Sequence, residues 1–190
     1  MHIKNMSGKI IFKDGSKNIK ECVIHALKRN IHLTGANFIR AELPNINFSG
    51  AELSEADFSR ANLSDTDFFG ANLYWTKFTR ANLTRSNLTR ANLTHADFIK
   101  ADLSWSKLTR ANVTQANFFG ANIFGANIDF ASWPLCCGSK NVKIDEKIAK
   151  QLAMHMLSAI GDMWPGGLTD EQRDWVNSCH RVVDGSFDRI

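Results

Sequence analysis

The stretch RANLTRSNLTRANLTHADF, residues 80 to 98, repeats a unit of five residues. Each unit holds a small residue, then usually Asn or Asp, then a large apolar residue and two further residues that are mostly polar. An α-helix repeats about every 3.6 residues and a strand every two, so a period of five matches neither. Around a helix, this period would drift by about 140° per unit and leave no apolar face. The stretch therefore predicts another kind of backbone.

The repeat continues on both sides of this stretch without insertion or deletion. Stepping by five from Leu33 to Ile128 meets twenty consecutive apolar residues, all of them Leu, Phe, Val or Ile. A small residue stands two positions before most of them, with Ile31 and Ile46 as large exceptions. Asn or Asp stands between the two in 15 of the 20 units. Because these side chains hydrogen-bond nearby backbone and tolerate unusual φ, we expect them at the bends.

A longer period of twenty residues lies within the shorter one. Phe recurs at every fourth unit, which predicts that four units close one coil and that like residues stack in successive coils. One coil cannot bury its apolar side chains alone, whereas stacked coils bury them together. With strands about 4.8 Å apart, the array predicts an all-β solenoid of about five coils with Leu and Phe inside. The recurring Phe residues are Phe38, Phe58, Phe78, Phe98 and Phe118.

The units ANLTR, ANLTH, ADFIK and ADLSW follow the pattern A-(N/D)-(L/F)-x-x, which resembles that of the pentapeptide-repeat family. The resemblance implies a quadrilateral β-helix, and its right-handedness rests on the resemblance alone. SWPLCCGSKNVKID is similar to endings found in phage-type members, so we expect such a member with helical terminal caps. Some members shield or inhibit DNA gyrase and topoisomerase IV with acidic surfaces that resemble duplex DNA. The array here is net neutral, so the sequence does not favour such mimicry.

The two ends of the chain differ from the repeat. We expect an N-terminal cap over 1–30, the β-helix over 31–135 and a helical C-terminal segment over 136–190. KIIF (9–12) predicts a strand, and NIKECVIHALKRN (18–30) predicts a helix whose apolar side covers the first coil. Two C-terminal helices, 145–160 and about 170–182, are predicted to pack on the last coil or to join two copies of the chain. The candidate dimerisation residues are Met154, Met156, Trp164 and Trp175.

Composition and motifs exclude several classes of protein. The sequence contains no apolar run of about 18 residues, so it predicts no helix that spans a membrane. The N-terminus has no signal-peptide pattern, and we therefore expect a cytoplasmic protein. No phosphate loop, nucleophile elbow or HExxH motif is present, and the four cysteines lack zinc spacing. The sequence therefore predicts no enzyme activity, no cofactor and no metal, with reduced thiols.

The surface charge changes along the predicted solenoid. Residues 31–70 contain two Arg against six acidic residues, whereas residues 71–110 contain seven Lys or Arg against two Asp. Exposed Trp, Tyr and Arg are the residues that most often anchor protein interfaces. The simplest alternative is that these charges only keep the solenoid soluble. The predicted partner-binding residues are Trp75, Lys77, Arg80, Arg85, Arg90, Lys100, Trp105 and Arg110.

These features favour a non-enzymatic, protein-binding solenoid. The first hypothesis is a phage-type accessory protein that inhibits or shields a host nucleic-acid-processing enzyme, such as a defence nuclease or a topoisomerase. The second is a structural scaffold or virion component that assembles through its ends. The third is weak binding of nucleic acid through the basic residues and their aromatic neighbours. The sequence names no partner.

Overall fold

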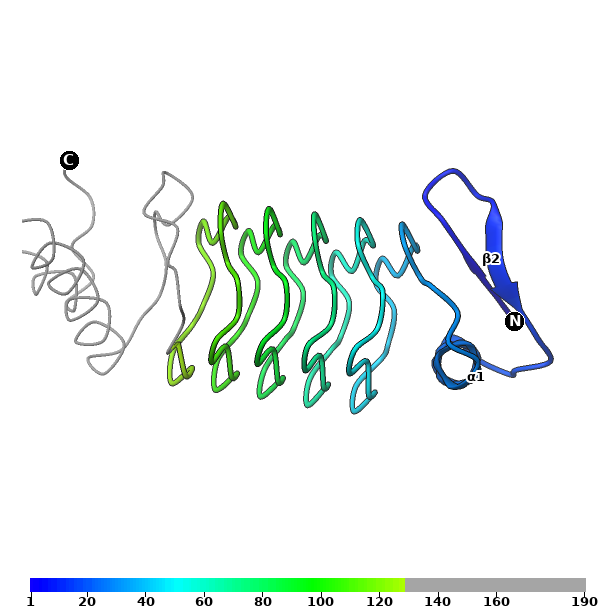
Figure 1. Cartoon of the computed structure of the whole chain (residues 1–190), viewed down its shortest axis with the longest axis horizontal. Coiled ribbons are helices and arrows are strands. Elements are labelled where there is room, and N and C mark those ends of the chain that lie inside the picture. The colour runs from blue at the N-terminus through cyan, green and yellow to red at the C-terminus, as the bar shows by residue number, and fades with distance from the viewer. Residues whose placement is uncertain (129–190) are drawn as a thin grey trace, which may run out of the picture. The chain divides into compact units, whose positions relative to one another are not determined.

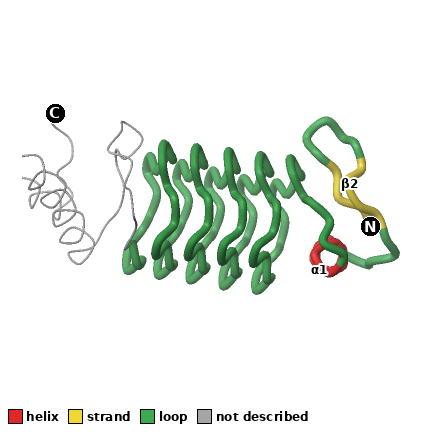
Figure 2. Tube along the Cα trace, viewed as in Figure 1, coloured by secondary structure: helices red, strands yellow, loops and turns green. Residues whose placement is uncertain are grey.

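The computed structural model describes residues 1–128, all of which lie within one compact unit. The helix and the two strands precede the repeat: β1 (His2–Lys4), β2 (Ile10–Lys13) and α1 (Ile19–Lys28). Figure 1 shows the repeat as successive turns of backbone that lie side by side. Figure 2 shows that these turns are drawn as loop rather than as regular strands. Each side of a coil is too short to form a named strand.

Stacked coils are joined by parallel bridges between residues twenty positions apart. The bridges run in steps of five from Asn37↔Asp57 to Lys107↔Asn127 without a break. At each bridge two backbone hydrogen bonds form: Phe38 N–H donates to the carbonyl of Asp57 at 2.8 Å, and Asp57 N–H donates to that of Ala36 at 2.9 Å. The twenty-residue period in the sequence is therefore the length of one coil, and each coil has four sides.

The bends do not lie where the sequence analysis placed them. We expected Asn and Asp to adopt the unusual φ, and this was wrong. Every fifth residue from 30 to 125 has a positive φ, and it is the second residue after each large apolar one. For example, Ala36 N–H donates to the carbonyl of Leu33 at 3.0 Å, and Gly35, third in this turn, has a φ of 65°. A turn with a positive φ at its third residue and not at its second is of type II, and the bend lies there.

Asn and Asp have a different role, on the flat sides of the coil. Their side-chain oxygens accept hydrogen bonds from the backbone N–H two residues later, as Asn37 Oδ1 does from Ile39 at 3.1 Å. Many also bond across coils, as Asn72 Nδ2 does to Glu52 Oε2 at 2.8 Å. The expected bond to nearby backbone is confirmed, and it secures the entry to each bend.

The interior is filled by stacked side chains, as predicted. The large apolar position is buried in every described unit. Phe58 and Phe78 stack at 5.5 Å between ring centroids, and Phe68, on the opposite side of the coil, meets each of them edge-on at 6.1 Å. Stacked and edge-to-face aromatic pairs each stabilise beyond simple burial, by about 0.5–1.5 kcal/mol. Small residues occupy the remaining inward position, because the bulky columns leave little space.

The N-terminal segment contacts the first coil of the repeat. The backbone N–H of Asn37 donates to the carbonyl of Lys4 at 2.8 Å, and Lys20 Nζ donates to the carbonyl of Pro44 at 2.6 Å. α1 begins after Asn18, whose Oδ1 accepts from the backbone N–H of Glu21 at 2.9 Å, a strong start signal for a helix. Its buried residues, Cys22, Val23 and Ala26, are among those predicted to form the apolar side. β1, which pairs antiparallel with β2, was not predicted.

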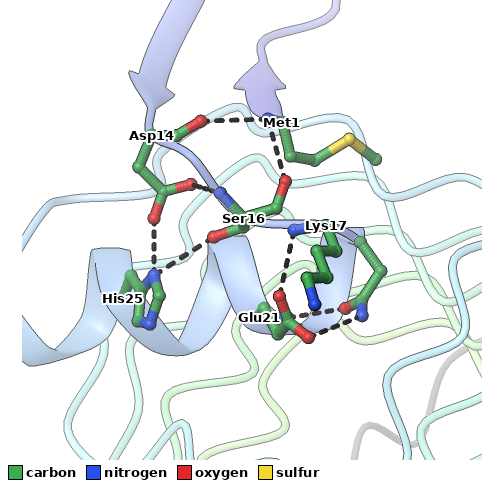
Figure 3. Close-up of polar contacts among 7 residues, drawn as sticks. Met1, Asp14, Ser16, Lys17, Glu21 and His25 are labelled. Atoms are coloured by element: carbon green, nitrogen blue, oxygen red, sulfur yellow. Dashed lines mark hydrogen bonds and ion pairs between the residues drawn. The ribbon is translucent and has the colours of Figure 1, made fainter.

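A polar cluster joins the hairpin to α1 (Figure 3). The carboxylate of Asp14 accepts from the backbone N–H of Ser16 at 3.0 Å and contacts Nδ1 of His25 at 2.6 Å. The N-terminal ammonium of Met1 donates to the carbonyls of Asp14 and Ser16. Hydrogen bonding by Ser16, and secondarily by His25, holds the pKa of the Asp14 carboxyl well below its usual range. This cluster ties the start of the chain to the helix.

The remaining expectations concern residues 129–190, outside the described part of the chain. They include the helices at 145–160 and 170–182 and the four candidate dimerisation residues. Within residues 1–128, no helix has the length and apolar character needed to cross a membrane.

Candidate functional site

The bends form four columns along the stack, because each coil has four bends and bent residues twenty positions apart lie in neighbouring coils. Columns five residues apart along the chain bound one side of the coil, and columns ten residues apart lie at opposite corners. The first column holds Arg40, Arg60, Arg80, Lys100 and Gly120; the second Asn45, Asp65, Arg85, Trp105 and Gly125; the third Asn30, Gly50, Gly70, Arg90 and Arg110; the fourth Gly35, Glu55, Trp75, His95 and Gln115.

These corner positions carry side chains that the backbone conformation does not favour. A positive φ costs an ordinary residue roughly 1–2 kcal/mol, and Gly, Asn and Asp are the residues that adopt it most readily. Arg, Lys, Trp, His, Gln and Glu nevertheless fill most of the corners. Local conformation does not explain this choice, so their side chains mark where a surface function is to be sought.

One side of the coils, between the second and third columns, carries a concentrated positive charge. We call it the basic face, and the five residues that define it are all exposed. The segments 85–90 and 105–110 contain four Lys or Arg and no acidic residue. An exposed indole lies among these cations, since Trp105 is 61% exposed. The members of the basic face are Arg85, Arg90, Trp105, Lys107 and Arg110.

The cations of the basic face differ in how they are held. Arg85 is paired with Asp65 of the preceding coil through two hydrogen bonds of 2.7 Å, which lower the pKa of the Asp65 carboxyl. The guanidinium of Arg90 lies over the ring of Phe69, 5.7 Å from its centroid. Lys107 and Arg110 make no ion pair with any residue between 1 and 128. Three of the four charges therefore remain available to an anionic partner.

The structure divides the eight predicted partner-binding residues between two opposite faces. Arg85, Arg90, Trp105 and Arg110 belong to the basic face. The other four, Trp75, Lys77, Arg80 and Lys100, lie along the side between the fourth and first columns. A partner that lies flat on one face cannot contact all eight.

The opposite face has a weaker positive character. The backbone of Lys77 forms β-bridges with Asp57 in the coil before it and with Asp97 in the coil after it. Acidic residues therefore flank Lys77 in its column. Asp97 also accepts a hydrogen bond from the hydroxyl of Thr79 at 3.2 Å. Of the two sides, the basic face is thus the better anion-binding surface.

Sequence reasoning overlooked Lys107, which completes the basic face. The available signal was the twenty-residue period itself: positions 87 and 107 stack, so Lys107 had to lie between the columns of Arg85 and Arg90. Listing together the residues that are twenty positions apart would have placed Lys107 on this face.

A cleft of about 600 Å³ lies between α1 and the first coil, two coils before the basic face. Its apolar lining includes Ile24, Leu27, Ile31 and Ile46. Ile31 and Ile46 occupy repeat positions that are otherwise small. The described residues contain no group of His, Cys, Asp and Glu that could hold a metal ion. Cys22 is a buried free thiol, and burial raises its pKa.

Comparison with known proteins gives the repeat a family. The family model for pentapeptide repeats matches residues 31–68, 46–85, 66–104, 86–123 and 96–132, which together exceed half of the chain. No curated protein matches the chain.

Solved structures include similar proteins. HetL, a pentapeptide repeat protein involved in heterocyst differentiation regulation in the cyanobacterium Nostoc sp. strain PCC 7120, is 28% identical with a TM-score of 0.55. The match covers 60% of this chain and 48% of HetL, so the chain spans about half the length of that relative. A pentapeptide repeat protein of the Arabidopsis thaliana thylakoid lumen is 25% identical, with a TM-score of 0.37, over 60% of this chain and 74% of its own. Rfr23 from the cyanobacterium Cyanothece 51142 is 24% identical, with a TM-score of 0.38, over 64% and 92%.

The family match, the unbroken five-residue register and the twenty-residue stacking of the described coils agree with one another. The chain belongs to the pentapeptide repeat family.

Proposed function

We propose that this chain is a non-catalytic protein-binding solenoid whose basic face docks on an acidic surface of a nucleic-acid-processing enzyme. The observation that carries the proposal is the basic face itself, beside Trp105. There, Arg90, Lys107 and Arg110 are exposed and make no ion pair with any described residue. A rigid stack of hydrogen-bonded coils holds these groups in fixed positions, so little order has to be gained on binding.

The chemistry of this face suits an acidic patch on a protein partner. Arg and Trp are enriched among residues that dominate binding energy. Nucleases and polymerases that use metal ions hold these ions with carboxylates, and a row of cations can meet such carboxylates. The role we propose is that of a phage-type accessory protein that inhibits or shields a host defence nuclease or topoisomerase in the cytoplasm.

The basic face would bind its partner mainly through charge and one aromatic group at its edge, Trp105. Neighbouring cations in stacked coils repel one another by only about 0.9 kcal/mol in water at a separation near 4.8 Å. An acidic partner removes this repulsion and adds attraction, which raises the association rate and makes it sensitive to salt. Trp105 would supply the apolar contact that slows dissociation.

The test is an affinity capture from a bacterial lysate, with nuclease-treated and untreated samples compared by mass spectrometry. Charge reversal by Arg90→Glu with Arg110→Glu alters the basic face. Arg80→Glu with Lys100→Glu makes the same charge change at the opposite corner and serves as the matched control. We expect one nucleic-acid enzyme to be captured after nuclease treatment, lost with the first variant and kept with the second.

Other results would favour the alternatives. Binding that survives only without nuclease treatment would mean that the basic face holds nucleic acid, since cations beside exposed aromatic rings also suit single strands. Capture that is insensitive to both charge reversals, with self-association alone, would favour a scaffold or virion component that assembles through its ends.

The finer architecture is part of this proposal. We infer a right-handed quadrilateral β-helix of about five coils over 31–135, with caps over 1–30 and 136–190, and a homodimer formed through the C-terminal segment. Light scattering would test the dimer, because replacing the four candidate residues by Ser should halve the mass in solution. The candidates are Met154, Met156, Trp164 and Trp175.

A further inference from the structure

A second cluster of aromatic side chains, two of them exposed and His95 half-buried, lies at the corner opposite Trp105. It consists of Tyr74, Trp75 and His95, of which Trp75 is 54% and Tyr74 39% exposed. The imidazole of His95 meets the Tyr74 ring edge-on at 5.7 Å, and its centroid lies 5.2 Å from that of Trp75. The three rings support one another on the outside of the coil stack.

Nothing in the packing of the core requires these rings. The inward positions of the same units are filled by Leu73 and Leu93, both fully buried. Trp75 and His95 stand at corners with φ of 56° and 60°, a conformation that favours Gly, and Gly35 does occupy the same column. A large exposed indole at such a position is a feature of the surface rather than of folding.

An acidic residue without an ion pair among the described residues stands one coil before the aromatic residues. Glu55 precedes Trp75 in the same corner column, and its backbone N–H donates to the carbonyl of Tyr74 at 2.8 Å. Glu55 is exposed and makes no ion pair with any described residue. The neighbouring acidic groups are differently engaged: Glu52 accepts from Asn72 Nδ2, and Asp57 is buried and accepts from the backbone of Ser59. Glu55 is therefore the free charge of this site.

Exposed rings of Trp and Tyr beside a free carboxylate form a recognition site for a cationic side chain. The negative face of an aromatic ring attracts a guanidinium or ammonium group, most strongly in Trp, and a carboxylate adds a hydrogen-bonded ion pair. The only cation on the adjoining side within two residues of Trp75 is Lys77, which lies between Asp57 and Asp97 in its own column. The site is thus open to a cation from outside.

We propose that Glu55, Tyr74 and Trp75 bind an arginine or lysine side chain carried by an extended basic segment of a protein partner. This site is separate from the basic face, because its column lies at the opposite corner from Trp105. The chain would then offer two docking surfaces of opposite preference, one for an acidic partner and one for a basic one. The proposal does not depend on the function proposed above.

The experiment titrates the full chain into a fluorescently labelled, end-blocked peptide that carries two arginines, and follows anisotropy. The variants are Trp75→Ala and Glu55→Gln. Two matched controls are Trp105→Ala, which removes the exposed indole of the opposite corner, and Glu42→Gln, which removes an exposed carboxylate of an earlier coil. Because these side chains lie on the surface, all four variants should fold, and thermal unfolding would verify this.

We expect wild type to bind the arginine peptide, and Trp75→Ala and Glu55→Gln each to weaken it roughly 2- to 30-fold, as cation–aromatic contacts do. Trp75→Phe should retain part of the affinity, and both controls should bind as wild type does. Absence of binding to wild type, equal loss with Trp105→Ala, or equal binding of an otherwise identical peptide with glutamines in place of the arginines would overturn the proposal.

Charge reversal at Arg90 and Arg110 separates the two proposals. It should abolish binding of the acidic partner and leave binding of the arginine peptide unchanged. If instead it changes the affinity for the arginine peptide as much as Glu55→Gln does, the peptide responds to net charge alone and the site does not exist.

Discussion

Arg85 and Asp65 form two hydrogen bonds of 2.7 Å, although they are twenty residues apart in the chain. Both stand at bends, with φ of 57° and 56°, and they occupy the same corner of neighbouring coils. The pair shows how the stack converts a distance in sequence into contact. It also neutralises Arg85, one cation of the basic face. Arg90, Lys107 and Arg110 are then the cations that remain to bind an anion.

The first prediction concerns the pH range over which this pair stabilises the fold. Hydrogen bonds from Arg85 lower the pKa of Asp65 in the folded chain, so the carboxyl of the unfolded chain, with a pKa of about 3.9, binds protons more readily. The stabilisation is therefore complete above about pH 4 and is lost as the pH falls through the lower, folded pKa. Asp65→Asn should be less stable than wild type at pH 7, and the two should converge in strong acid.

Thermal unfolding of both proteins across this pH range measures the difference. Since the pair is exposed, the difference should be small and should shrink in high salt. A gap between the two proteins that grows as the pH falls would contradict the assigned sign.

The second prediction concerns Gly125, against which the indole of Trp105 packs. A Cβ atom at Gly125 would lie 2.6 Å from Cε3 of Trp105, closer than carbon atoms approach. Gly125→Ala should therefore destabilise the fold by about 1–3 kcal/mol through overpacking, in addition to the conformational cost of its positive φ. Denaturant unfolding would measure this loss.

Gly70 supplies the matched control for that substitution. Its φ of 62° is similar, and a Cβ there would meet nothing within 4 Å, so Gly70→Ala should show only the conformational cost. In the double variant with Trp105→Ala, Gly125→Ala should cost no more than Gly70→Ala does. An undiminished loss in the double variant would show that the indole is not the cause.

The third prediction concerns two serines in the core. The hydroxyls of Ser86 and Ser106 are buried and lack a hydrogen-bond partner within the described residues. A buried hydroxyl without a partner costs about 1–3 kcal/mol of desolvation. Ser86→Ala should therefore raise the free energy of unfolding, by up to about 1 kcal/mol after the lost packing of the oxygen is counted.

Thr76 provides the contrast, because its buried hydroxyl donates to the carbonyl of Leu53 at 3.0 Å. Thr76→Ala should lower stability where Ser86→Ala raises it. Calorimetric melting of the two variants beside wild type would decide, and equal destabilisation by both would mean that Ser86 has a partner in solution, such as a bound water.

The fourth prediction concerns the backbone strain at the corners. Arg60 has a φ of 61° and is exposed, so its side chain can be replaced without disturbing the core. Arg60→Gly should be more stable than Arg60→Ala by roughly 1 kcal/mol, since only glycine adopts this φ without a Cβ penalty.

Chemical unfolding of the two Arg60 variants gives the comparison free of the charge change, which they share. If Arg60→Ala proved as stable as Arg60→Gly, the backbone at these corners would not be strained. The side chains there would then not mark a surface function.

The sequence predicted the coil and its contents well. Leu33 to Ile128 kept the five-residue register, and the Phe residues stacked every twenty positions, because burial of large apolar side chains is a local rule repeated in each unit. α1 lies within the segment that was predicted helical, and its start at Asn18 is visible as a capping pattern. The strand β1 was missed, since His2–Lys4 is short and is stabilised by its pairing with β2 rather than by its own residues.

The surface was predicted less well. The bends were assigned to Asn and Asp from the preferences of those residues, whereas the hydrogen bonds between coils impose the positive φ on Arg, Trp and His instead. Tertiary contacts overrode local preference there. The predicted partner-binding residues were taken together over 75–110, whereas the stack places Trp75 and Trp105 at opposite corners.

The sequence by itself determined the period, the core and the family of this protein, because each five-residue unit repeats the same choice of inward side chain. Only the tertiary structure decided which outward residues act together. Neighbours on a coil are five residues apart and lie around a corner, whereas neighbours along a face are twenty apart and in contact, as Arg85 and Asp65 are. A surface assembled from such distant residues is fixed by the closure of the coil.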